Sequence, residues 1–433
     1  MSSRIALAAI LAQALWIAPL RAQVGSDWID AAMPQWLEFY RDLHRHPELS
    51  FRETRTAGKV AEAFAAAGLT VTRNVGGLGV VGVLENGAGP TLLVRCDMDA
   101  LPIGERTGLE YMSKLRVEGE DGRVGGVMHA CGHDLHMSTV AAAATWLGAH
   151  RDRWRGTLVC IGQPAEERAG GAKAMLEDGL LTRFPKPDHA IALHVSADLP
   201  AGTIGWCAGP AMANVESVDV LIRGRGGHGA APHLTIDPIP IACRFVLDLQ
   251  TIVAREVPPT SPAVVTVGAI NGGSKHNIID AECRLQLTIR SYDEAVHALV
   301  KAAIERKAKA AAASSGAPDP ELAFSEFTPA LVNDAALTAR CVAAFRGELG
   351  EAAVVAIDPA MVAEDFGRLR LAGVPIHMFR LGTTAQARLD DHAARGVPVP
   401  ALHSAEYWPD VEPSLRAGVR ALAAAACALL PAP

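Results

Sequence analysis

The spacing of hydrophobic residues predicts alternating helices and strands in the first half of the chain. Apolar residues at helical spacing cover residues 34–43, 52–67 and 135–150. Short apolar runs typical of buried strands lie at residues 80–84, 91–96, 158–161 and 190–195. Strands that alternate with helices predict a mostly parallel sheet with flanking helices, so the expected fold class is α/β.

The pattern changes near residue 209 and returns near residue 323. Between these points, alternating polarity indicates antiparallel strands at residues 217–223, 264–270 and 283–290. Helix-like segments accompany them at residues 238–254 and 292–313, and a later strand is expected at residues 373–381. We expect an export signal (1–22), a main domain in two parts (23–212 and 326–433), and a smaller inserted α/β lid domain with an antiparallel sheet (213–325).

Composition and charge narrow the class of protein. Half of the 433 residues are hydrophobic and the formal net charge is -7, which argues against nucleic acid as a partner. Arg4, the apolar run 5–20 and the small residue Ala22 resemble an export signal, although a membrane anchor is the alternative. We expect cleavage near Ala22, a periplasmic or secreted protein, and no stable membrane insertion after cleavage.

The eight cysteines do not form a recognisable disulfide framework. Most lie in segments with helix or strand patterns, and none is paired at short range. We expect most of them to be buried free thiols, and a single disulfide stays open.

One segment combines residue types that bind metals. Residues 127–137 read VMHACGHDLHM. Cys131 and His133 are one residue apart, so in an extended segment both side chains lie on the same face. The helix expected next places its N-terminus beside Cys131, where partial positive charge favours the thiolate. His136 is a less favoured ligand, His129 is expected to be structural, and a buried cysteine with incidental histidines is the alternative for this segment alone.

Further donor residues follow other expected strands. Glu167 ends TLVCIGQPAEE (157–167), His194 lies near the end of the strand-like DHAIALHV (188–195), and His403 lies in PALHSAEY (400–407). Ligands of open α/β sheets bind at the carboxyl ends of the strands. Together with Cys131 and His133 these are five donors, which exceed one tetrahedral site. We therefore expect two metal ions close together with at least one shared ligand.

Seven strings resemble a known family: LHRHPELSFRET (43–54), RCDMDALPI (95–103), MHACGHDLH (128–136), GQPAEE (162–167), GRGGHGAAPH (224–233), AEDFG (363–367) and LHSAEY (402–407). From about residue 30 onwards, the chain resembles the metal-dependent amidohydrolases of the aminoacylase and carboxypeptidase group. Within it, the chain is similar to the branch of hippurate hydrolases, N-acyl-amino-acid amidohydrolases and indole-acetyl-amino-acid hydrolases. The main domain is then expected to be catalytic.

The resemblance implies roles for individual residues. Five match metal ligands: Cys131, His133, Glu167, His194 and His403. Glu166 matches the general base, which activates water and later protonates the leaving amine. Asp97 and Asp99 could bind a metal themselves or orient the ligating histidines; the resemblance implies the orienting role, with Asp99 the better candidate. We interpret His44 and His46 as structural.

The lid contributes residues of a different kind. Four glycines surround His228 in GRGGHGAAPH, so the backbone can approach a ligand closely; a surface turn with an incidental histidine is the alternative. The resemblance implies that His228 reaches the substrate carbonyl, often from the neighbouring subunit of a dimer, and that Asn277 and Arg290 hold the amino-acid carboxylate. The strings HNIID and HSAEY depart from the family pattern, which affects substrate choice more than mechanism.

The sequence therefore predicts an exported enzyme that cleaves the amide bond of an N-acyl-amino acid, hippurate-like or related, into an acid and an amino acid. It requires two divalent metal ions, with Zn favoured and Mn, Co or Ni as alternatives. The expected partners are a small-molecule substrate and a second copy, as a homodimer or higher homo-oligomer through the lid. The alternatives are a dipeptidase or carboxypeptidase on the same scaffold, and a non-catalytic periplasmic binding protein, which would not need the Glu166 base.

Overall fold

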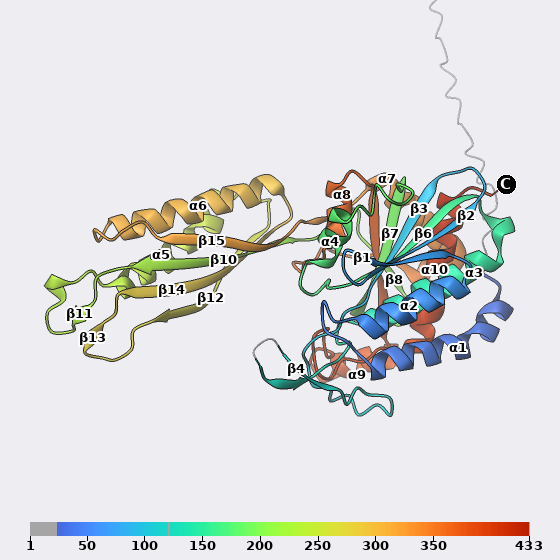
Figure 1. The fold of residues 1–433 in the computed structure, drawn as a ribbon, viewed down its shortest axis with the longest axis horizontal. Coiled ribbons are helices and arrows are strands. Elements are labelled where there is room, and N and C mark those ends of the chain that lie inside the picture. The colour runs from blue at the N-terminus through green and yellow to red at the C-terminus, as the bar shows by residue number, and fades with distance from the viewer. Residues whose placement is uncertain (1–23, 120–121, 433) are drawn as a thin grey trace, which may run out of the picture.

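The computed structural model describes residues 24–119 and 122–432, which form two lobes (Figure 1). We call them the main lobe and the lid. The expected export signal, residues 1–22, lies outside the described residues. No described helix combines the length and the hydropathy that a membrane crossing requires.

The main lobe is built on an eight-stranded sheet. In spatial order its strands are β1 (Thr70–Val75), β2 (Gly79–Asn86), β6 (Gly156–Gln163), β3 (Thr91–Asp97), β7 (His189–Pro200), β18 (Ile376–Thr384), β8 (Ile204–Trp206) and β17 (Val354–Ala356). The central strands β6, β3, β7 and β18 pair in parallel. Antiparallel pairs occur between β1 and β2, β2 and β6, and β18 and β8. The alternation of strands and helices thus correctly predicts the parallel centre of the sheet.

Helices cover both faces of this sheet. One face packs against α1 (Ser26–Arg45), α2 (Thr54–Ala66), α3 (His133–Ala149), α7 (Ala335–Leu349) and α10 (Val411–Leu429), and the other against α4 (Gly171–Glu177) and α8 (Gly367–Leu371). Helix α1 buries one stripe that includes Trp36, Tyr40 and Leu43. Helix α3 is apolar around most of its circumference and is buried accordingly. The short α9 (Gln386–Ala394) has no buried residue.

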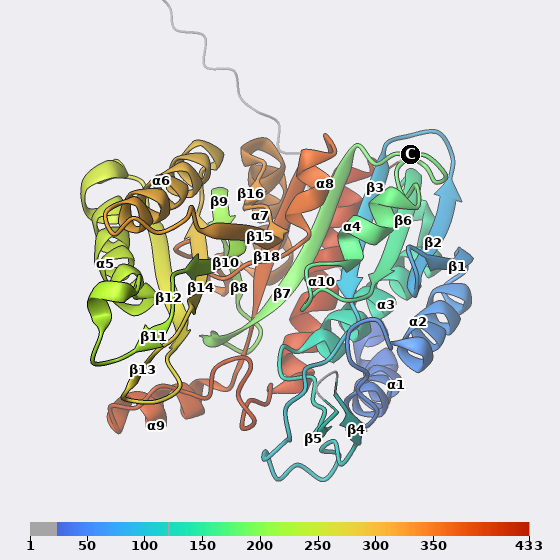
Figure 2. The ribbon, with the colours of Figure 1, turned by 60° about the vertical axis from the view of Figure 1, so that its left-hand side comes forward.

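The lid contains a four-stranded antiparallel sheet. Its spatial order is β12 (Ala263–Gly272), β14 (Glu282–Ser291), β10 (Asn214–Arg223) and β15 (Glu321–Thr328). Alternate residues of β10 and β14 pack against α5 (Pro238–Thr251) and α6 (Glu294–Ala313). Figure 2 shows both helices beside the lid sheet. The three strands expected here are present. The hydrophobic pattern did not predict the fourth strand, β15. This strand continues past residue 325, the expected end of the lid domain.

Small strand pairs complete the fold. The chain enters and leaves the lid beside the pair of β9 (Gly209–Met212) and β16 (Leu331–Asn333). A second pair, β11 (Gly227–His228) and β13 (Ile278–Ile279), lies at the end of the lid that points away from the main lobe (Figure 1). A third pair joins β4 (Arg116–Glu118) to β5 (Val124–Gly126).

Candidate metal centre and substrate cavity

A cavity of about 830 Å³ lies between the main lobe and the lid. Its wall on the main lobe includes Glu166, His194 and His403, and its wall on the lid includes Arg290 and Thr328. A volume of this size suits a small-molecule ligand. The metal-donor residues expected from the sequence therefore open into a cavity that both lobes form.

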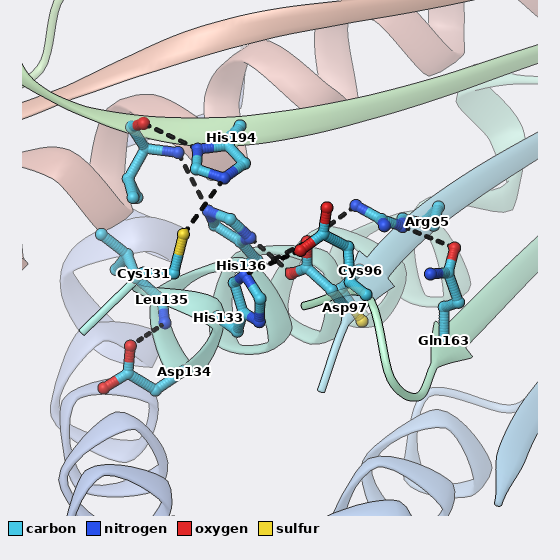
Figure 3. Close-up of polar contacts among 12 residues, drawn as sticks. Arg95, Cys96, Asp97, Cys131, His133, Asp134, Leu135, His136, Gln163 and His194 are labelled. Carbon is cyan, nitrogen blue, oxygen red and sulfur yellow. Dashed lines mark hydrogen bonds and ion pairs between the residues drawn. The ribbon is translucent and has the colours of Figure 1, made fainter. Parts of the chain in front are cut away.

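The structure brings all five expected metal donors together. The Cys131 Sγ atom lies 3.5 Å from His194 Nε2 and 3.3 Å from His403 Nε2. The Glu167 Oε1 atom lies 3.4 Å from His403 Nε2 and 3.9 Å from His133 Nε2. Cys131 belongs both to a group with His133 and His194 and to a group with Glu167 and His403. Figure 3 shows Cys131 facing His194. Cys131, His133 and Glu167 each belong to more than one donor group, as a pair of metal ions with shared ligands would require.

The polar atoms of this cluster fit a metal. Among the residues that the structure describes, His133 Nε2 and Glu167 Oε1 are buried and have no hydrogen-bond partner, which is costly for polar groups that no cation compensates. Burial, and then the carboxylates of Glu167 and Glu166, raise the pKa of the Cys131 thiol well above its usual value. Because a coordinated cation deprotonates a thiol outright, the thiolate ligand depends on the metal itself.

A tight turn at Gly132 sets the geometry of the Cys-x-His segment. Gly132 has φ 77° and caps α3, and a Cβ at this position would lie 2.6 Å from Val195 Cγ2. Only glycine satisfies both conditions. The expectation of an extended segment was therefore wrong: Cys131 and His133 reach one centre because the chain turns into the helix between them.

Hydrogen bonds orient the ring of His133. Its Nδ1–H donates to the backbone carbonyl of Asp99 at 2.8 Å, so Nε2 keeps its lone pair toward the cluster. The Asp99 carboxylate lies 3.3 Å from the same Nδ1 and accepts from Ser50 Oγ at 2.7 Å and from the Glu167 N–H at 3.0 Å. Burial alone would raise the pKa of Asp99, but the hydrogen bonds from His133 and Ser50 outweigh it and lower the pKa. Asp99 thus positions both His133 and Glu167.

His194 presents its Nε2 atom in the same way, because Nδ1–H donates to the Val195 carbonyl at 2.8 Å. The sequence placed His194 near the end of its strand, which was wrong. Strand β7 continues to Pro200, but its pairing with β3 stops at Ala192. His194 therefore lies where β7 has parted from β3, and its side chain lines the cavity.

Glu166 and Glu167 occupy a strained turn after β6. Ala165 and Ala169 have φ 49° and 51°, values in the left-handed region that non-glycine residues rarely adopt. The Glu166 Oε2 atom lies 4.0 Å from His133 Nε2, about as close as the Glu167 carboxylate. The bent backbone thus turns both side chains toward the cluster.

The other histidines of the motif are not placed as ligands. His136 Nδ1–H donates to Asp97 Oδ1 at 2.5 Å, and His136 Nε2 accepts from the Val195 N–H at 2.9 Å, so neither ring nitrogen is free (Figure 3). His129 is buried, and burial lowers its pKa to about 4. His44 lies between the carboxylates of Asp134 and Glu105.

A buried arginine organises the acidic residues below the cluster. Arg95 Nη2 lies 2.7 Å from Glu364 Oε1 and 3.1 Å from Asp365 Oδ1, and Arg95 Nη1 lies 2.7 Å from Asp97 Oδ2. Burial, followed by the carboxylates of Glu364 and Glu167, raises the pKa of Glu166 well above its usual value. Arg95, Glu364 and Asp365 lie in the family-like strings 95–103 and 363–367, but the sequence alone indicated no role for them. A charged residue inside the apolar strand TLLVRCD was the available signal, because a buried charge requires partners.

The lid residues divide into two groups. Arg290 lines the cavity, and its Nη1 donates to the Met361 carbonyl at 2.7 Å. His228 and Asn277 are exposed at the lid tip, where Gly229 N–H donates to the Asn277 carbonyl at 2.9 Å. Neither of them lines the cavity of its own chain. A single chain therefore holds Arg290 at the cavity but not His228 or Asn277.

Comparison with known proteins shows the family. The fold and the donor cluster define a metal-dependent hydrolase, and the model of peptidase family M20/M25/M40 matches residues 93–408. The chain belongs to this family and is thus a metal-dependent amidohydrolase or peptidase.

Two relatives and one solved structure illustrate the similarity. Thermostable carboxypeptidase 1 of Saccharolobus solfataricus is 35% identical over 361 residues, which cover 82% of this chain and 86% of the relative. N-acetyldiaminopimelate deacetylase of Geobacillus thermodenitrificans is 37% identical over 366 residues, with 83% and 91% covered. The crystal structure of a Bacillus subtilis protein, described as a dinuclear metal-binding peptidase of family M20, matches with TM-score 0.75 and 28% identity, covering 93% of this chain and 99% of that one.

Proposed function

We propose that this enzyme hydrolyses the amide bond of N-acyl-amino acids with the help of two divalent metal ions. Zn²⁺ is the favoured metal, and Mn²⁺, Co²⁺ or Ni²⁺ are the alternatives. The observation that carries the proposal is the position of Cys131 in two donor groups at once, with the Glu166 carboxylate beside them. The dinuclear relative supports the number of metals. The N-acetyldiaminopimelate and N-acetyl-L-cysteine deacetylases among the relatives support the substrate class.

Each residue of the chain has a distinct task in this proposal. When bound, the two cations act as Lewis acids that polarise the amide carbonyl and make water more acidic. Glu166 accepts a proton from the attacking water and returns it to the leaving amine, a task for which a raised carboxyl pKa is suited. Asp99 keeps His133 and Glu167 in place. Arg290 offers its remaining N–H groups to the α-carboxylate of the substrate.

A substrate and metal panel tests the proposal. We would assay acetyl, benzoyl and indole-acetyl amino acids beside dipeptides with a free α-amine, each with added Zn, Mn, Co or Ni and after chelation. We expect N-acyl substrates to be cleaved, close to two metal ions per chain by elemental analysis, and loss of activity in chelator. Full activity without bound metal would overturn the metal role, and turnover restricted to free-amine peptides would overturn the substrate class.

A carboxypeptidase or dipeptidase is the second candidate, because two of the relatives are named thermostable carboxypeptidases. Its chemistry would use the same metal donors and the same base. The free-amine arm of the panel distinguishes the two candidates.

The position of His228 makes a second subunit part of the proposal. His228 does not line the cavity of its own chain, so polarisation of the substrate carbonyl by His228 requires the lid of a partner in a homodimer or higher homo-oligomer. The exposed backbone edge of the lid and the exposed Leu234 and Ile278 near its tip are surfaces that such contacts could bury.

Export through residues 1–22 is also proposed, with N-terminal sequencing of the mature protein as its test.

A further inference from the structure

Arg380 occupies an unusual place in the main sheet. It interrupts the otherwise largely apolar strand β18, IHMFRLGTT. In the parallel pairing of β18 with β7, Arg380 is the register partner of His194. Register partners on neighbouring strands project to the same face of a sheet, and both residues line the cavity. The guanidinium is therefore a cation in the cavity wall next to the proposed metal centre.

Within residues 24–119 and 122–432, Arg380 has no hydrogen-bond or ion-pair partner. The other arginines near the site do have one. Arg95 is paired with Glu364, and Arg290 donates to Met361. An arginine that is partly buried and carries no partner is costly unless a ligand supplies one.

The acidic residues near the cavity do not pair with the Arg380 guanidinium. The carboxylates of Glu364, Glu166 and Asp198 lie near enough to act on the charge of Arg380. Both oxygens of Glu364 are already bonded to Arg95. Glu166 faces His133 in the proposed metal cluster, and Asp198 is exposed to solvent. Burial lowers the pKa of Arg380, but an arginine side chain stays protonated at neutral pH.

We propose that Arg380 binds a second carboxylate of the substrate, so that the enzyme prefers N-acyl-amino acids with two carboxylates. The proposal rests on the proposed function, in which Arg290 on the lid side of the cavity takes the α-carboxylate. A guanidinium forms two parallel hydrogen bonds with a carboxylate. The second carboxylate can belong to the acyl group or to the side chain of the amino acid, and both offer the same chemistry to Arg380.

Matched pairs of substrates test this assignment and distinguish the two sources. N-acetylglutamate against N-acetylglutamine varies the charge on the amino-acid side chain. N-succinyl-leucine against its succinamoyl counterpart varies the charge on the acyl group. Each pair conserves size, so the ratio of kcat/KM within a pair reports recognition of the carboxylate.

Three variants accompany the wild type: Arg380→Met, Arg380→Lys and the control Arg244→Met, which removes an exposed lid arginine bonded to Ser314 and Ser315. We expect the wild type to prefer the dianionic member of one pair by roughly 10- to 150-fold, as for a charge-assisted hydrogen bond. Arg380→Met should lose this preference mainly through KM, Arg380→Lys should keep part of it, and Arg244→Met should keep all of it. No preference in the wild type, or an equal preference in Arg380→Met, would overturn the assignment.

A binding measurement separates this proposal from the proposed function. Calorimetric titration of the metal-loaded wild type and Arg380→Met with glutarate and with its monoamide needs no turnover. We expect glutarate to bind the wild type at least 10-fold more tightly than its monoamide does. Glutarate and the monoamide should bind Arg380→Met with equal affinity. This result would support Arg380 even if no amide in the panel were cleaved. Equal binding of glutarate and the monoamide by the wild type would refute the role of Arg380 whatever the enzyme hydrolyses.

Discussion

Replacing His44 with glutamine should destabilise the protein to an extent that depends on pH. The buried His44 side chain lies 2.7 Å from Asp134 Oδ2 and 3.2 Å from Glu105 Oε1. It thereby joins α1 to the first turn of α3 and to the loop that carries Glu105. Burial alone would lower the pKa of His44, but the hydrogen bonds to both carboxylates outweigh it and raise the pKa from 6.5 to about 9.

The sign and size of the effect follow from this pKa. A shift of one unit corresponds to about 1.4 kcal/mol, so a rise from 6.5 to about 9 corresponds to about 3 kcal/mol. Because the pKa is higher in the folded than in the unfolded state, the stabilisation is complete below about pH 6.5. It declines as the pH rises and is lost above about pH 9.

The measurement is unfolding in urea at pH 6.0, 7.5 and 9.5, followed by tryptophan fluorescence. Residues 214–328 contain no tryptophan, so this signal reports on the main lobe. We expect the stability gap between wild type and His44→Gln to be about 3 kcal/mol at pH 6.0 and to shrink strongly by pH 9.5. The control His46→Gln changes an exposed side chain bonded to the Asp42 carbonyl and should stay within about 0.5 kcal/mol of wild type. An equal gap for His44→Gln at pH 6.0 and 9.5 would refute the reasoning.

The remaining predictions concern the catalytic roles. Glu166→Gln should reduce kcat by at least about 10²-fold with metal content near wild type, whereas Glu167→Gln should also lose metal in elemental analysis; the opposite pattern would exchange the two roles. His228→Ala should depress kcat for acid and amide substrates alike. Mixing the His228→Ala and Glu166→Gln variants should restore part of the activity, because a mixed dimer contains one intact site. No recovery despite subunit exchange would place His228 outside the partner's site. Arg290→Ala should raise KM for N-acyl-amino acids and change turnover of the corresponding amides little, and equal losses for both would make Arg290 structural.

The sequence pointed to the candidate donor residues but not to the way in which they meet. Cys131, His133 and Glu167 stand out because cysteine, histidine and paired glutamates are rarely found together beside turns of an apolar chain. Their convergence depends on backbone conformations that spacing does not encode. The left-handed φ of Gly132 brings Cys131 and His133 together, and the positive φ of Ala165 turns Glu167 toward them.

Residues that act through long-range pairing were harder to find. Arg380 lies 186 positions after His194 in the sequence, and only the register between β18 and β7 places the two side by side. The lid strand β15 was missed for a different reason. Its sequence, ELAFSEFT, follows an alanine-rich helix and a turn, and it is one edge of the lid sheet, so only one neighbour, β10, stabilises it.

The metal donors and the base do not by themselves determine the substrate. A carboxypeptidase and a deacylase place the same demands on a Lewis acid and on Glu166, since both cleave an unactivated amide. Discrimination must therefore come from the parts of the cavity wall that contact the substituents of the amide. Arg290 on the lid and Arg380 on the main sheet are cations on two different walls of one cavity. In the proposed function each favours a carboxylate, because an uncharged group would leave the cation unpaired. Substrate choice would then depend on the charges at both ends of the substrate and on how closely the lid approaches the sheet.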